Sequence, residues 1–151
     1  MLMWALKDIP RGPLLLGFSG LLPFVAGAML SWVLAPGPLA ATAGFATVAY
    51  GACILSFMGA VHWGAALVSG GRGVLDYGPS VVPSLIGWVG LVLPVSIGGW
   101  VVAIGLALVF WLDGQPPAGV RFPPWYRRLR IWLTSGAITA LVATMLARHL
   151  G

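Results

Sequence analysis

The sequence predicts an all-α integral membrane protein with five transmembrane helices. Composition is the first observation behind this prediction: of 151 residues, 60% are hydrophobic and only 7% are charged, whereas soluble domains carry about 25% charged residues. The second is that the apolar residues form long stretches, as membrane-crossing helices require. The eight Trp and 22 Gly agree with this fold class, because tryptophan collects at membrane interfaces and membrane helices tolerate glycine.

The expected spans follow from the lengths of these stretches. We place them at about residues 14–34, 39–68, 80–95, 98–112 and 131–147. The apolar region 80–112 is divided in two because one helix of that length would reach about 50 Å, well beyond the hydrocarbon core. Pro94 and Gly98–Gly99 favour a hinge there, since proline removes a backbone donor and glycine permits a tight reversal. The whole chain, residues 1–151, is expected to form a single membrane domain.

The distribution of basic residues supports five spans and predicts their direction. With five helices, seven of the eight basic residues fall on one face of the membrane: Lys7, Arg11, Arg72, Arg121, Arg127, Arg128 and Arg130. Arg148 alone falls on the other face. Because cytoplasmic segments are enriched in Lys and Arg, we expect a cytoplasmic N-terminus and a periplasmic C-terminus. The net charge of +5 is thereby explained by membrane orientation, and no nucleic-acid partner is expected.

A small-residue stripe on the second span predicts a helix-packing surface. Ala52, Ser56, Ala60 and Gly64 recur every four residues. Small side chains allow membrane helices to approach closely, so we expect this stripe to contact a neighbouring helix.

His62 is the candidate functional residue of the same span. Ionisable groups inside the membrane are costly and often mark functional sites. We expect His62 to hydrogen-bond to a neighbouring helix or a free carbonyl group, or to contact a lipid-soluble ligand together with the aromatic side chains of Trp63 and Trp88. Haem and metal sites are not expected, because His149 should lie at the opposite face and no carboxylate falls inside a span.

The basic cluster before the last span suggests a second surface. Arg127, Arg128 and Arg130 follow Trp125 and Tyr126 at the expected cytoplasmic end. Such a cluster anchors a helix at the interface, and it also suits contact with anionic lipids.

Several segments resemble an uncharacterised family of small polytopic inner-membrane proteins of proteobacteria, which has a mitochondrial transmembrane relative. The matching segments are Ile9–Arg11, Tyr50–Gly64, Tyr77–Leu85 and Trp125–Arg130. The resemblance covers nearly the whole chain. It implies several spans and residence in the bacterial inner membrane, and it implies no activity.

The sequence therefore favours two possible functions. The first is a non-enzymatic accessory or assembly component of a larger respiratory or energy-transducing membrane complex, without a cofactor, with the lipid bilayer, anionic lipids and other membrane subunits as partners. The alternative is a binder or transporter of a small lipid-soluble ligand such as a quinone, with His62 at the site. No nucleophile–base pair or metal set supports an enzyme.

Overall fold

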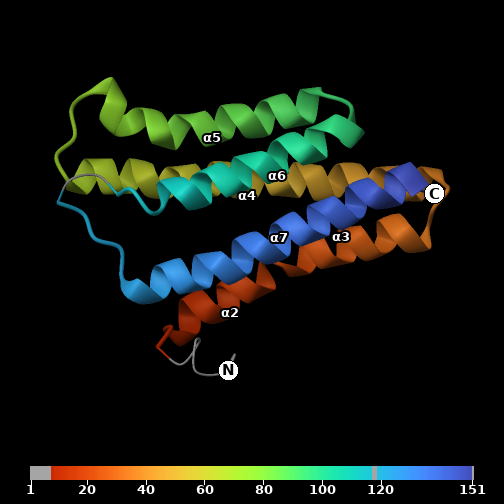
Figure 1. Cartoon of the computed structure of the whole chain (residues 1–151), viewed down its shortest axis with the longest axis horizontal. Helices are drawn as coiled ribbons and strands as arrows, with labels where there is room; N and C mark the ends of the chain where they lie inside the picture. The colour runs from red at the N-terminus through yellow and green to blue at the C-terminus, as the bar shows by residue number, and fades with distance from the viewer. Residues whose placement is uncertain (1–7, 117–118, 151) are drawn as a thin grey trace.

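The computed structural model describes residues 8–116 and 119–150, which form helices and short connections without a strand (Figure 1). The helices are α2 (Arg11–Ser19), α3 (Leu22–Val33), α4 (Pro38–Val68), α5 (Val74–Val92), α6 (Val95–Leu112) and α7 (Pro124–Leu150). Successive long helices run in opposite directions (Figure 1). The all-α class is therefore confirmed. Lys7, one of the basic residues expected at the cytoplasmic face, lies outside the described residues.

Within the part of the chain that the structure describes, four helical segments are long and apolar enough to cross a membrane: Arg11–Val33, Pro38–Val68, Val95–Leu112 and Pro124–Leu150. The 19-residue α5 runs alongside α4, and a break at Leu93–Pro94 separates it from α6. The chain is thus a multi-pass membrane protein. The start of α2 and the loops after α4 and α6 lie at one end of the bundle (the left of Figure 1), and α7 ends at the other. Which end faces the cytoplasm stays a prediction.

The first membrane segment is interrupted at Gly20 and Leu21, where α2 gives way to α3. Pro23 lies in the first turn of α3, a position where a missing N–H costs little. The interruption frees a carbonyl group, and the hydroxyl of Tyr50 on α4 donates to the carbonyl of Gly20 at 3.0 Å. The ring of Tyr50 also packs edge-on against Phe24, with ring centroids 5.0 Å apart. Contacts from α4 therefore stabilise the break.

Glycines set the distances between helices along the rest of the bundle. A Cβ atom on Gly87 of α5 would lie 3.2 Å from the carbonyl oxygen of Ala52 on α4. On Gly98 of α6, it would clash with the carbonyl oxygen of Gly90 on α5. The backbones thus approach too closely for a side chain, as in other membrane helix pairs. Around these contacts lies an apolar core whose most buried members are Phe24, Val48, Leu55, Val102, Leu106, Val109, Leu141 and Met145.

The prediction that the whole small-residue stripe of α4 contacts a neighbouring helix is wrong within this chain. Ala52 is buried, but Ala60 and Gly64 are exposed, and a Cβ on Gly64 would meet nothing within 4 Å. The reason is geometric, because each four-residue step turns about 40° past a full turn and three steps turn about 120°. The observed packing face alternates steps of three and four residues and consists of Val48, Ala52, Leu55, Gly59, His62 and Ala66.

We expect Gly59→Ala to destabilise the protein and Gly64→Ala to leave it unchanged or slightly more stable. A Cβ on Gly59 would lie 2.5 Å from the carbonyl oxygen of Ser80, and such overpacking costs about 1–3 kcal/mol. Gly64 has free space, and alanine favours helix over glycine by about 0.5–1 kcal/mol. Thermal unfolding of the two variants in detergent is the measurement. Equal shifts for both would contradict the packing face described above.

A buried His62–Asp113–Arg130 cluster as candidate functional site

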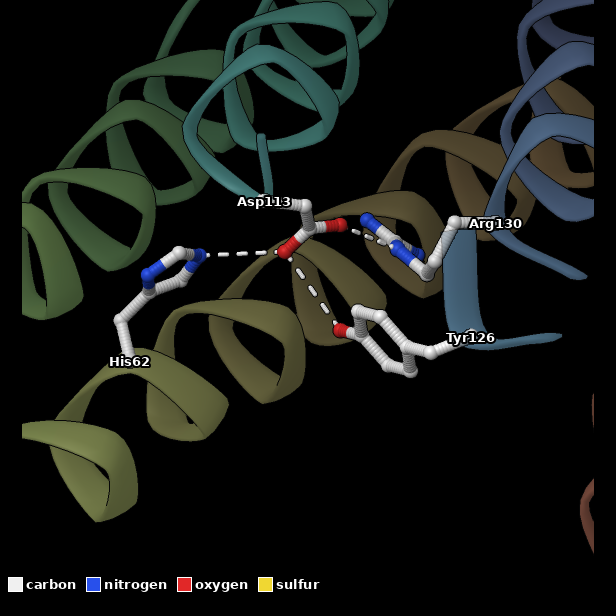
Figure 2. Close-up of polar contacts among 4 residues, drawn as sticks. All are labelled: His62, Asp113, Tyr126 and Arg130. Carbon is white, nitrogen blue, oxygen red and sulfur yellow. Dashed lines mark hydrogen bonds and ion pairs between the residues drawn. The ribbon is translucent and has the colours of Figure 1, made fainter. Parts of the chain in front are cut away.

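Four polar side chains converge near one end of the bundle (Figure 2). The carboxylate of Asp113 lies at their centre. Its Oδ1 is 3.1 Å from Nε2 of His62, and its Oδ2 is 2.6 Å from Nε of Arg130. The hydroxyl of Tyr126 lies 3.4 Å from Oδ1. We call these four residues the polar cluster.

The polar cluster joins residues of three helices, and α4 is distant in sequence from the other two. His62 lies in the last third of α4, Asp113 directly follows α6, and the other two residues lie near the start of α7. The 31 residues of α4 span about 46 Å, whereas the 18 residues of α6 span about 27 Å. Helix α4 therefore extends beyond the end of α6 (Figure 1). Asp113, the first residue after α6, therefore lies beside α4 and not beyond its end.

Hydrogen-bond accounting assigns the roles in the polar cluster. As a carboxylate, Asp113 accepts from His62, Arg130 and Tyr126, so Nε2 of His62 carries the hydrogen in that contact. The contact with Arg130 is charge-assisted and short, whereas the contact with Tyr126 is near the outer limit for a hydrogen bond. The side chains of His62, Asp113 and Arg130 are at most 6% exposed. Their charges are therefore balanced by one another and not by water.

Aromatic rings close the polar cluster on the loop side. Phe122 places its ring edge-on to His62, with centroids 6.2 Å apart, and packs against Tyr126 at 4.9 Å. These contacts cover the imidazole with the segment that leads into α7. They exclude water from that side of the carboxylate.

Two hollows flank the polar cluster. The larger, about 440 Å³, has His62 and Leu112 in its wall together with polar groups of the α4–α5 connection, including Arg72 and Asp76. The smaller, about 120 Å³, is mostly apolar and lies where α2 gives way to α3, with Arg130 in its wall. The polar cluster thus separates a polar hollow at the bundle end from an apolar one between helices.

Asp76 shapes the polar hollow by holding the start of α5. Its Oδ2 accepts hydrogen bonds from the backbone N–H groups of Gly73 at 2.8 Å and Arg72 at 2.9 Å. These bonds to the charged form lower the pKa of Asp76 below its ordinary value of 3.8. This stabilising contact is present above that value and is lost as the pH falls through the lowered pKa.

Two sequence predictions about His62 are changed by this geometry. No carboxylate was expected inside a span, but Asp113 lies one residue beyond the expected span 98–112 and hydrogen-bonds to His62. The expectation of a histidine without a carboxylate neighbour is therefore wrong. The aromatic wall proposed around His62 is not assembled, because Trp63 is 46% exposed and packs on Tyr77, and Trp88 is 63% exposed on α5. Successive helical residues point about 100° apart, which directs Trp63 away from the polar cluster.

The basic cluster divides into three different environments. The prediction that Arg130 contacts anionic lipids is wrong, because Arg130 is buried and pairs with Asp113. Arg128 pairs with Asp8 at 3.2 Å in an exposed contact, and Arg127 is exposed. Lipid contact at Arg127 and Arg128 stays a prediction.

Sequence reasoning missed Asp113 as the partner of His62, and it missed Tyr126 as a donor to Asp113, although a signal for Asp113 was present. Alternating steps of four and three residues mark the buried face of α6 at Val102, Leu106 and Val109, and the next step reaches Asp113. On α7 the same alternation links Arg130, Thr134, Ala137, Leu141 and Thr144.

Within residues 8–116 and 119–150, no group of three or more His, Cys, Asp or Glu side chains is suited to hold a metal ion.

Comparison with known proteins places the chain among transmembrane proteins. Residues 9–146 match the model of a family described as "Protein of unknown function (DUF3429)". The chain is 37% identical over 149 residues to "Transmembrane protein 69" of Xenopus tropicalis, covering 94% of this chain and 56% of that protein. It is 28% identical over 148 residues to "Transmembrane protein 69" of Mus musculus, covering 96% and 60%. The chain thus spans less than two thirds of these relatives. No solved structure matches it.

We expect Asp113→Asn to destabilise the protein by about 3–5 kcal/mol, because it leaves the guanidinium of Arg130 buried without its counter-charge. The double variant Asp113→Leu with Arg130→Met should recover most of that loss, since an apolar pair of similar size avoids the desolvation cost. Thermal or denaturant unfolding in detergent provides the comparison.

Asp8→Asn is the matched control. It also removes a carboxylate from an arginine, but that pair is exposed on both sides, and exposed pairs contribute about 0–1 kcal/mol. A double variant as unstable as Asp113→Asn would refute the idea that the unpaired charge is the cause.

Proposed function

Because the chain belongs to the DUF3429 family of transmembrane proteins, we propose that it is a non-enzymatic protein of the bacterial inner membrane that binds a small lipid-soluble ligand at the polar cluster. The observation that carries the proposal is the complete burial of His62, Asp113 and Arg130 between helices of an otherwise apolar bundle. The ligand-binding hypothesis for His62 is thereby extended to the side chains around it.

Stability does not account for such a cluster. Buried ion pairs contribute little or even cost stability relative to apolar residues of the same size, because both charges lose their hydration. Ionisable side chains inside membrane proteins face the bundle interior and mark sites of ligand or ion contact. The two hollows on either side of the polar cluster give a ligand access to it. A binding role therefore explains the presence of the cluster better than packing does.

We expect the wild-type protein to retain a small lipid-soluble ligand through purification and His62→Ala to lose most of it. The variant removes one donor from Asp113 and opens the wall of the larger hollow, while leaving the Arg130–Asp113 pair in place. Native mass spectrometry in mild detergent measures the bound mass.

Trp88→Ala is the control for this experiment, because Trp88 is exposed on α5 and should leave the bound ligand unaffected. The double variant Asp113→Leu with Arg130→Met tests the same point in a folded protein without the ion pair. An unchanged ligand complement in all three variants would remove the case for binding at the polar cluster.

A second candidate function is an accessory component of a larger membrane complex. It is supported by the part of α4 that the chain leaves uncovered, where Ala60 and Gly64 form a small-residue surface. Small residues allow a second helix to approach closely in the membrane. This surface suits a helix of another subunit.

We expect Gly64→Leu to abolish co-purification of partner subunits while leaving the thermal stability of the isolated protein unchanged. Leucine fills the approach to the α4 surface, whereas Gly64 contacts nothing within the chain. Purification at endogenous expression levels, with mass-spectrometric identification of bound subunits, is the test. Recovery of the protein without partners in both wild type and variant would exclude this role.

A further inference from the structure

Two residues that line the smaller hollow each carry a buried polar atom with no hydrogen-bond partner among the described residues. These atoms are Nη2 of Arg130 and Oγ1 of Thr134. Both residues line the cavity of about 120 Å³, and both are at most 6% exposed. An unsatisfied buried donor costs about 1–3 kcal/mol, so such atoms call for a partner.

The two atoms come from the same face of one helix. Arg130 and Thr134 are four residues apart on α7, which places their side chains one above the other. Asp113 occupies Nε of Arg130 and so orients the guanidinium. The rest of the cavity wall is apolar and includes Leu21, Ile54 and Met58. The cavity wall is thus apolar apart from two residues of α7 that each carry an unsatisfied polar atom.

We infer that this cavity binds the carbonyl oxygen of a neutral lipid-soluble molecule, which accepts hydrogen bonds from Arg130 Nη2 and Thr134 Oγ1. This inference rests on the proposed function and specifies its site and ligand class. Charge decides between acceptors: Asp113 already neutralises Arg130 at 2.6 Å. A carboxylate would add a second negative charge beside Asp113 in a desolvated site, whereas a carbonyl adds none.

Size and position agree with a small head group on an apolar body. An apolar protein cavity of about 150 Å³ accepts a benzene-sized ring, and this cavity is slightly smaller and only partly enclosed. Its lining residues on α7 run from Arg130 to Ala137, the second to fourth turns of that helix, on the inner side of Arg127 and Arg128. Both a quinone ring and the acyl ester of a lipid present a carbonyl group of this kind.

The experiment measures dissociation constants from ligand-dependent thermal stabilisation in an alkyl maltoside detergent, which itself carries no carbonyl group. The probes share a ten-carbon chain: a decyl-substituted benzoquinone, monodecanoylglycerol, decanoate and decylbenzene. We expect at least one of the two neutral carbonyl probes to bind more tightly than decanoate and decylbenzene. The better of the two identifies a quinone or an ester as the source of the carbonyl.

The variant Thr134→Val removes the hydroxyl and keeps the shape of the side chain. It should weaken binding of the preferred probe by about 3- to 10-fold, the effect of one hydrogen bond. Thr144→Val is the matched control on the same helix, because Thr144 is equally buried but its hydroxyl donates to the carbonyl of Ala140. Its dissociation constant should match that of the wild type.

Three results would overturn the inference: no binding of either carbonyl probe, binding of decylbenzene or decanoate as tight as theirs, or an unchanged constant in Thr134→Val. Native mass spectrometry separates this failure from failure of the proposed function. An endogenous ligand that is lost in His62→Ala but retained in Thr134→Val keeps binding at the polar cluster and excludes the carbonyl site. Absence of any ligand from the wild type removes the proposed function itself.

Discussion

Close approach of helix backbones at glycine is the constraint on which the rest of the structure depends. In a bilayer, an apolar side chain interacts as favourably with lipid as with another apolar side chain. Helices therefore gain from contact with each other only when they pack very closely. Gly59 and Gly87 bring α5 against α4, and Gly90 and Gly98 bring α6 against α5. Each contact leaves little or no room for a side chain, so each restricts how far one helix can shift along the next. The relative heights of His62 and Asp113 follow from these shifts.

At those heights, the polar cluster is satisfied on one side and incomplete on the other. Asp113 accepts from three donors, and its charge is balanced by Arg130. The guanidinium of Arg130, in contrast, keeps an unused donor beside an apolar cavity. Arg130 of the polar cluster thus lines the apolar cavity, while His62 lines the polar hollow at the bundle end. Rigid positioning of this kind reduces the ordering cost of binding a ligand.

Composition and local signals were sufficient to predict the helical class, its membrane setting and the break near Pro94, because each depends on residues close together in sequence. The interruption at Gly20 has a local cause as well, because Pro23 suits the first turn of a new helix. The polar cluster was not predicted, because it depends on α4 being longer than α6 and on the shift between them. In the sequence, Asp113 follows one apolar stretch and Arg130 precedes the next. Both therefore resembled residues of the loop between two spans. The alternating three- and four-residue spacing shows their inward direction, but it does not show which residue on another helix they meet.

The pairing of Asp113 with Arg130 also has a consequence for how the chain enters the membrane. Arg130 is followed by the apolar residues of α7, so inserting this helix alone would carry an uncompensated charge toward the hydrocarbon. The pair with Asp113 is neutral, and only 16 residues of chain separate the two partners. Insertion of α6 and α7 together, as a helical hairpin, therefore avoids the cost that either helix would bear by itself.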